Sequence, residues 1–170
     1  MSRLTGSPRA SSQKGEPSGP CVRDASLADV QAVAAGVAAL LEELGGRAPD
    51  RPSMETAARA VISDPSLGCV LVGEDGGTVV GVLAASWQTA IHAGGRYALI
   101  QDLWVAPAWR RGRLASSMVQ HLVEMARELE MTRIEVGLPP PRFDGSQATE
   151  AFYLRSGFRS VGLRMRLGLA

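Results

Sequence analysis

The chain has 170 residues, a formal net charge of +1 and 45% hydrophobic residues. This length suits one buried domain and is short for two, and a general nucleic-acid binder would carry a much stronger basic excess. No apolar run approaches the roughly 20 residues that cross a bilayer. From the low net charge we expect no nucleic-acid partner, and from the short apolar runs no membrane partner.

The N-terminal segment differs in composition from the rest of the chain. Residues 1–20 are rich in Ser, Gly and Pro and contain almost no large apolar side chain. Such a segment buries too little surface to offset the entropy of ordering, so we predict a disordered tail over 1–20 and one domain over 21–170. The tail also lacks the apolar core of a secretory signal. Cys21 and Cys69 have no metal-ligand spacing and no obvious partners, and both lie in apolar segments. We therefore predict buried free thiols in a reducing compartment and a cytoplasmic protein.

The first part of the domain contains a short strand and two helices in our prediction. Ser26 or Asp24 is expected to cap the first helix, whose apolar residues recur at helical spacing until a glycine pair at 45–46. Ser53 is expected to be the N-cap of the second helix. The predicted elements are a strand at 21–26, a helix at 27–44 and a helix at about 53–62.

From residue 68 onward the pattern becomes typical of strands. The sequence EDGG at 74–77 predicts a hairpin turn, and a polar loop is expected over 88–96. Pro107 ends the third strand because proline cannot donate to a ladder. The predicted strands of this part are 68–73, 78–87 and 97–105.

The last part of the chain returns to helix and strand in turn. Apolar residues at steps of four, four, three and four predict one face of a helix that starts at residue 114. The remaining predictions are a strand at 133–138, a short helix at 149–155 and a final strand at 158–169. This order predicts an α/β (α+β) fold with a central mixed sheet and helices on both faces.

The segment 100–115, IQDLWVAPAWRRGRLA, runs from an apolar strand through an arginine-rich loop into a helix. The loop and the helix start offer backbone N–H groups and the positive end of a helix dipole, to which Arg110, Arg111 and Arg113 add charge. This combination predicts a pyrophosphate site. The alternative is that these arginines form only a solvated surface.

Residues 102–119 (DLWVAPAWRRGRLASSMV) and 151–158 (AFYLRSGF) resemble the GCN5-related N-acetyltransferase superfamily in order and spacing. The resemblance covers about 22–169 and implies a single-domain fold with a splayed pair of parallel strands. It also implies acetyl-CoA as co-substrate, with its pantetheine on the first splayed strand and its pyrophosphate on the loop. The cofactor-binding residues it implies are Leu103, Trp104, Val105, Arg110, Arg111, Gly112, Arg113, Leu114, Ala115, Ser116 and Ser146.

Two positions depart from the family pattern. The pattern Arg/Gln-x-x-Gly-x-Gly/Ala matches residues 110–115, but its fourth position is Arg113, and a glycine stands one place earlier at Gly112. Glycine is favoured there because the backbone must approach phosphate closely. Ser146 occupies about the place of an Asn that often contacts the cofactor in the family, so we expect that contact to be shortened or lost.

Tyr153 is the general acid that the resemblance implies, protonating the departing thiolate. A phenol with a pKa of about 10 suits a thiolate whose pKa is about 8.5, and the alternative is a tyrosine that only packs beside Phe152. Asp102 is the candidate base or substrate ligand, with Glu135 as a second internal carboxylate, because an acid within an apolar strand is costly unless it is partnered. Asp102 could equally hold a loop amide or pair with an arginine.

The resemblance therefore implies an N-acetyltransferase that transfers an acetyl group from acetyl-CoA to a primary amine. We expect direct attack in a ternary complex, because no cysteine lies at a motif position suited to a covalent intermediate. No metal is expected, the acceptor stays open, and a homodimer is an expectation drawn from the family. The alternatives are a non-catalytic acyl-CoA sensor and a transferase of a longer acyl group.

Overall fold

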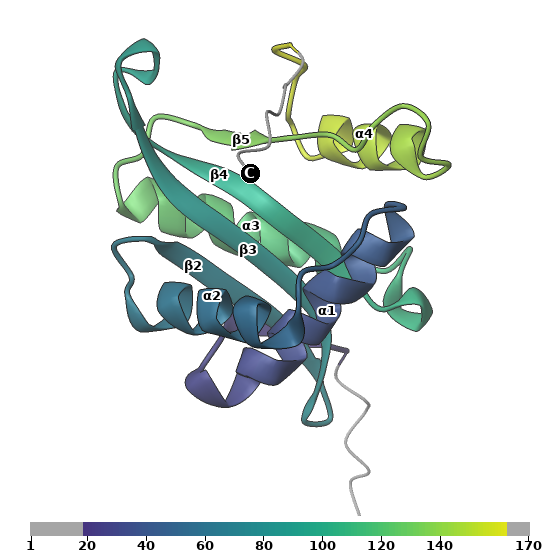
Figure 1. Ribbon diagram of the computed structural model, residues 1–170. Coiled ribbons are helices and arrows are strands. Elements are labelled where there is room, and N and C mark those ends of the chain that lie inside the picture. The colour runs from purple at the N-terminus through teal and green to yellow at the C-terminus, as the bar shows by residue number, and fades with distance from the viewer. Residues whose placement is uncertain (1–18, 163–170) are drawn as a thin grey trace, which may run out of the picture.

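The structure, a computed structural model, describes residues 19–162 (Figure 1). It contains a five-stranded sheet in the order β1-β2-β3-β4-β5, in which only β4 and β5 are parallel neighbours. The strands are β1 (Cys21–Asp24), β2 (Gly68–Asp75), β3 (Thr78–Ala90), β4 (Gly95–Val105) and β5 (Ile134–Val136). The helices are α1 (Val30–Glu43), α2 (Arg51–Ser63), α3 (Leu114–Glu128) and α4 (Ser146–Arg155).

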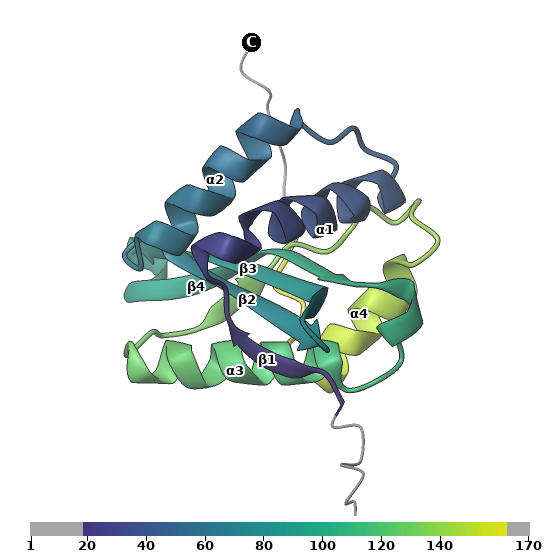
Figure 2. The same cartoon turned by 90° about the horizontal axis from the view of Figure 1, so that it is seen from below.

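Helices cover both faces of the sheet, as the sequence predicts (Figure 2). On one face, α1 and α2 pack on a cluster around Val33, Val72 and Val82. On the other face, α3 supplies Met118 and Leu122 to the larger cluster, which Tyr153 of α4 joins. The predicted α/β fold class with a mixed sheet is confirmed.

A close approach between α1 and β4 depends on Gly36. A Cβ atom at this position would lie 2.8 Å from Cε3 of Trp104, which is closer than real Cβ contacts. The glycine therefore lets the indole of Trp104 pack closely against α1. The indole Nε1 is buried without a hydrogen-bond partner among the described residues.

The structure corrects two helix and strand boundaries. The N-cap of α2 is Asp50 and not Ser53, since the Asp50 carboxylate accepts a hydrogen bond from the Ser53 backbone N–H at 3.0 Å. The loop expected over 88–96 is also wrong, because β3 and β4 continue pairing through Thr89 and Arg96. Its polar composition fits an outlying hairpin, and Gly94 takes the left-handed φ of 69° at the turn.

The structure also bears on the expectations for the two cysteines, the two ends of the chain and a membrane span. Cys69 is buried, and burial raises the pKa of its thiol to about 12, but Cys21 is exposed because β1 lies at the edge of the sheet. Residues 1–18 of the expected tail and 163–170 of the expected final strand lie outside the described residues, and 158–162 contain no strand. None of the described helices is long and apolar enough to cross a membrane.

Candidate active site

The parallel strands β4 and β5 separate after a short stretch of pairing. Their register joins Ala98 to Ile134, Leu99 to Glu135 and Ile100 to Val136, and it ends there, although β4 continues to Val105. In Figure 1 the chain after β5 runs toward α4 while β4 runs toward the loop before α3. The splayed pair expected from the sequence is therefore present, with its opening beyond Ile100.

The backbone of the splayed part of β4 faces the opening at alternate residues. The Ala106 N–H donates to the Val80 carbonyl on the β3 side, at 2.9 Å. Because backbone groups alternate along a strand, Leu103 and Val105 turn theirs to the open side. Trp104 turns its own toward β3, where it is paired with Val82. Of the strand residues expected at the cofactor, Leu103 and Val105 are thus the two with backbone groups on the open side, and the Val105 carbonyl there already accepts from Nε of Arg110.

The arginine loop joins β4 to α3 and has one strained residue. Arg111 has a φ of 63°, a left-handed conformation that side chains other than glycine rarely adopt. The only glycine of the loop, Gly112, is the next residue and does not have a positive φ. Arg113 is the N-cap of α3 with an ordinary right-handed backbone, φ −88° and ψ −8°. The departure from glycine at this position therefore causes no backbone strain.

The three arginines of the loop differ in what they contact. Arg110 donates from Nε to the Val105 carbonyl at 2.7 Å and from Nη2 to Oε1 of Glu43 at 2.6 Å. The side chains of Arg111 and Arg113 are exposed and form no hydrogen bond or ion pair within residues 19–162. The cation that the sequence pattern puts first is therefore engaged by the protein, while the other two are available to an anion.

The start of α3 has the features of an anion site. Leu114, Ala115 and Ser116 form its first turn, where backbone N–H groups have no carbonyl partner within the helix. No acidic residue lies in this turn, so no carboxylate competes for those groups. Leu114 is buried and anchors the turn, whereas Ser116 is exposed. The N–H groups of this turn and the two exposed arginines therefore belong to the same end of the helix.

Tyr153 lies in the apolar cluster on the α3 side of the sheet. Its side chain is 6% exposed and its ring makes edge contacts with the rings of Phe152 and Phe158. Burial raises the pKa of its phenol above the ordinary value. The group therefore stays protonated over the physiological pH range and can act only as a proton donor or a packing residue.

Asp102 lies on the opposite face of β4 from Tyr153. It is paired in register with Ala84, which packs in the cluster under α1 and α2. Burial raises the pKa of its carboxyl, and within residues 19–162 no hydrogen bond or ion pair offsets that cost. The pairing with an arginine that the sequence left open is absent from the described part of the chain.

The two other candidates occupy less central places. Glu135 is half-buried on β5, with its carboxylate 3.8 Å from Nη1 of Arg133, the residue just before that strand. Ser146 is the first residue of α4, and its N–H donates to the Phe143 carbonyl at 2.9 Å. Glu135 is therefore a weaker candidate for the base than Asp102. No group of three His, Cys, Asp or Glu side chains in residues 19–162 is arranged to hold a metal ion.

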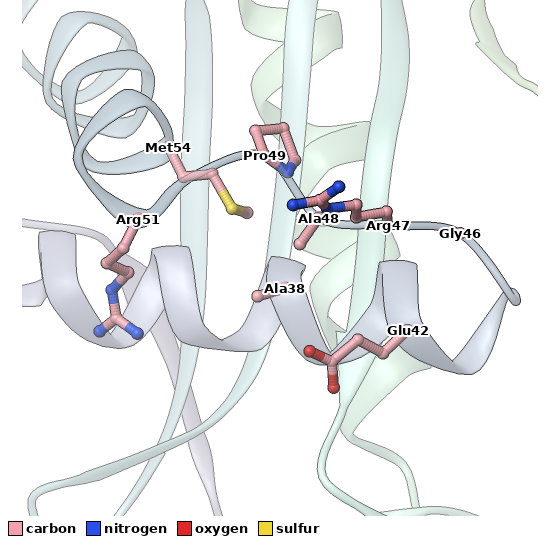
Figure 3. Close-up of a pocket in the computed structure, with 8 residues that line it drawn as sticks. All are labelled: Ala38, Glu42, Gly46, Arg47, Ala48, Pro49, Arg51 and Met54. Carbon is pink, nitrogen blue, oxygen red and sulfur yellow. The ribbon is translucent and has the colours of Figure 1, made fainter.

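A separate hollow of about 440 Å³ lies between α1, α2 and the link that joins them (Figure 3). It is lined by Ala38, Glu42, Gly46, Arg47, Ala48, Pro49, Arg51 and Met54. None of the candidate residues on β4, the arginine loop or α4 lines it. One contact near this region has no signal in the sequence, because Glu43 and Arg110 are 67 positions apart.

Comparison with solved structures shows the same fold in several acetyltransferases. A possible acetyltransferase from Clostridium difficile has a TM-score of 0.75 at 16% identity, over 90% of this chain and 99% of that one. A predicted acetyltransferase with acetyl-CoA from Clostridium acetobutylicum has a TM-score of 0.73 at 17% identity, over 88% and 96%. An aminoglycoside acetyltransferase from an uncultured soil metagenomic sample has a TM-score of 0.72 at 20% identity, over 90% and 100%.

The sequence itself gives the assignment to a family. No protein with a curated description matches it. Residues 37–158, which include the splayed strands, the arginine loop and Tyr153, match the model of the acetyltransferase (GNAT) family. The chain belongs to the GNAT acetyltransferase family.

Proposed function

We propose that the protein transfers an acetyl group from acetyl-CoA to a primary amine of a small molecule or a protein. The observation that carries this proposal is the open edge of β4 between its pairing with β5 and the start of α3. The backbone of Leu103 and the N–H of Val105 face that edge, which suits the amides of a pantetheine arm in the manner of an added strand. The neighbour solved with acetyl-CoA supports this co-substrate.

The phosphates of the co-substrate are assigned to the loop and the first turn of α3. Arg111 and Arg113 supply charge there, and backbone N–H groups from Gly112 to Ser116 supply directed donors. The guanidinium group of Arg110 is bound to Val105 and Glu43, so Arg110 contributes to this site only as part of the loop's backbone.

The chemistry requires one proton to leave the amine and another to reach sulfur. The amine nitrogen attacks the thioester carbonyl carbon, so a C–N bond forms, the C–S bond breaks and its electron pair stays on sulfur. Asp102 takes the proton from the amine, and the Tyr153 hydroxyl donates its proton to the thiolate. The phenolate then regains a proton from solvent and Asp102 releases one, which leaves an amide and the free thiol.

The two groups lie on opposite faces of the sheet, and the opening between β4 and β5 is where those faces meet. A raised pKa makes Asp102 a stronger base near neutral pH. The raised pKa of Tyr153 makes it a weaker acid than a phenol in water. A thiolate that forms beside it in the same apolar surroundings is also desolvated, so its own proton affinity rises in parallel.

Direct attack is supported by the places of the two cysteines. Cys69 is buried on β2 with a pKa of about 12, and Cys21 lies on β1 at the far edge of the sheet from β5. Neither thiol borders the opening. The aminoglycoside acetyltransferase among the neighbours supports a small molecule with amino groups as the acceptor. Cytoplasmic localisation and a homodimer stay predictions.

Calorimetric titration with acetyl-CoA, followed by thiol-release assays over a panel of amines, tests the proposal. Binding together with amine-dependent thiol release is the expected result. Binding of acetyl-CoA without release on any amine would favour the acyl-CoA sensor, and faster release from longer acyl thioesters would favour a different acyl group. Absence of binding would contradict the proposal as a whole.

A further inference from the structure

One arginine joins the end of α1 to the splayed edge of β4. Arg110 uses Nε to bind the Val105 carbonyl at 2.7 Å and Nη2 to bind the Glu43 carboxylate at 2.6 Å. Val105 belongs to the edge assigned to the co-substrate, and Glu43 is the last residue of α1. The guanidinium group therefore bridges two elements that lie far apart in the sequence.

The stability of α1 does not explain an acid at this position. Glu43 lies where the negative end of the helix dipole disfavours a carboxylate, and the last turn of α1 contains no basic residue. Arg110 supplies the missing positive charge from outside the helix. The two side chains are 41% and 34% exposed, so solvent screens their attraction. The contact is thus better suited to setting geometry than to stabilising the whole fold.

The end of α1 leads directly to the link that forms one wall of the hollow in Figure 3. In the other direction, α1 packs through Gly36 on Trp104, which lies on the same face of β4 as Asp102. A shift of α1 would therefore move both the link and the surroundings of the candidate base. What holds the end of α1 therefore also affects the side of the sheet on which Asp102, the candidate base, lies.

We propose that Glu43 is a positioning residue. Through Arg110 it couples the conformational stability of the arginine loop, residues 106–113, to that of the link between α1 and α2, residues 44–50. The proposal rests on the proposed function only in naming the loop's ligand as coenzyme A. In this role Arg110 is a bridge between α1 and β4 and not a phosphate ligand.

The first test uses the chain without any ligand and measures amide hydrogen exchange. Glu43→Ala is expected to speed exchange in both segments, 44–50 and 106–113, although the change is made in only one of them. Glu42→Ala is the matched control, because the Glu42 side chain is exposed on the same helix turn and forms no hydrogen bond or ion pair within residues 19–162. Unchanged exchange over 106–113 in Glu43→Ala would overturn the proposal.

The second test is calorimetric titration with coenzyme A. Glu43→Ala and Arg110→Lys are each expected to weaken binding about two- to fivefold, and the double variant no more than Arg110→Lys alone, because one contact is lost in all three. Glu43→Gln keeps an oxygen that accepts from Arg110 and should recover most of the affinity. Tighter binding by Glu43→Ala would overturn the proposal, since it would mean that Glu43 withholds Arg110 from the phosphates.

The two proposals fail in different ways. If the unchanged chain does not bind coenzyme A, the proposed function is contradicted, while the exchange experiment still decides on the bridge. If coenzyme A binds and the Glu43→Ala and Glu42→Ala variants behave alike in both tests, only the bridge is contradicted.

Discussion

Two carboxylates within the fold, Asp29 and Asp102, have opposite surroundings. Asp29 is 7% exposed and accepts hydrogen bonds from the Arg23 guanidinium at 2.8 and 2.9 Å and from the Ser26 N–H at 2.7 Å. These donors hold the pKa of its carboxyl well below the ordinary value. Burial instead raises the pKa of Asp102, which none of the described residues pairs.

The same contrast separates the arginines. Arg23 is held between Asp29 and Glu74, and Arg110 between Glu43 and a carbonyl, whereas Arg111 and Arg113 project into solvent. A charge with complete protein partners stabilises the chain's own fold. A charge that lies in or beside the opening of the sheet and has no protein partner is available to a ligand. The comparison predicts that the two groups of residues respond oppositely to substitution.

Asp102→Asn is expected to have the largest effect. Loss of a general base lowers kcat/KM by about 10²- to 10⁴-fold, while the free energy of unfolding at pH 7 should not fall, because a desolvated charge has been removed. Thiol-release kinetics and urea denaturation measure the two quantities. Glu135→Gln is the control on the neighbouring strand, and equal losses of rate in both variants would break the comparison.

Asp29→Asn should do the reverse. Breaking the contacts to Arg23 and Ser26 is expected to lower the free energy of unfolding by about 2–4 kcal/mol. The rate per folded molecule should stay unchanged, since the Asp29 carboxylate bonds to Arg23 and Ser26 and to none of the candidate site residues. Asp24→Asn, an exposed neighbour at the end of β1, serves as the control in the same urea titrations.

The pH dependence of these two stabilities sharpens the comparison. The pKa of Asp29 is lowered by folding, so its contribution is present above its unfolded pKa of about 3.9 and is lost as the pH falls through its folded pKa. The pKa of Asp102 is raised, so its contribution is present below about 3.9 and is lost as the pH rises through its folded pKa. Acidification should therefore reduce the difference in unfolding free energy between wild type and Asp29→Asn. It should also raise the unfolding free energy of wild type relative to that of Asp102→Asn.

Tyr153→Phe should give the next largest effect. Removal of the hydroxyl leaves the packing with Phe152 and Phe158 in place, so turnover should fall about 10²-fold with little change in coenzyme A affinity. Phe158→Leu is the control for packing, because it changes the same apolar cluster and leaves the Tyr153 hydroxyl in place. A turnover unaffected by Tyr153→Phe would leave Tyr153 a packing residue.

The smallest effects are expected at Arg111 and Arg113, the loop arginines whose side chains have no partner in the described part of the chain. Arg111→Ala and Arg113→Ala should each weaken coenzyme A binding about 3- to 10-fold while barely changing pantetheine binding, because pantetheine lacks the pyrophosphate. Arg127→Ala, near the other end of α3, is the control. Equal losses on both ligands would show that these side chains act through the loop's conformation and not through phosphate.

Much of the fold could be predicted from local patterns. The helical spacing of Met118 and Leu122 and the EDGG turn at 74–77 are short-range features, and both elements are present in the structure. Boundaries were harder to predict where two residues offered the same chemistry. Asp50 and Ser53 are both good caps, and only the folded backbone shows that Asp50 accepts the hydrogen bond.

The candidate site divides in the same way. The sequence alone determined the family, the arginine loop at the start of α3 and the tyrosine of α4, because each is a contiguous pattern of residues. Only the tertiary structure decided that Arg110 is held by Glu43, that Asp102 has no partner among residues 19–162 and that Arg111 takes the strained conformation. These facts depend on which distant groups meet when the sheet and helices pack, and no local spacing of residues encodes such a meeting.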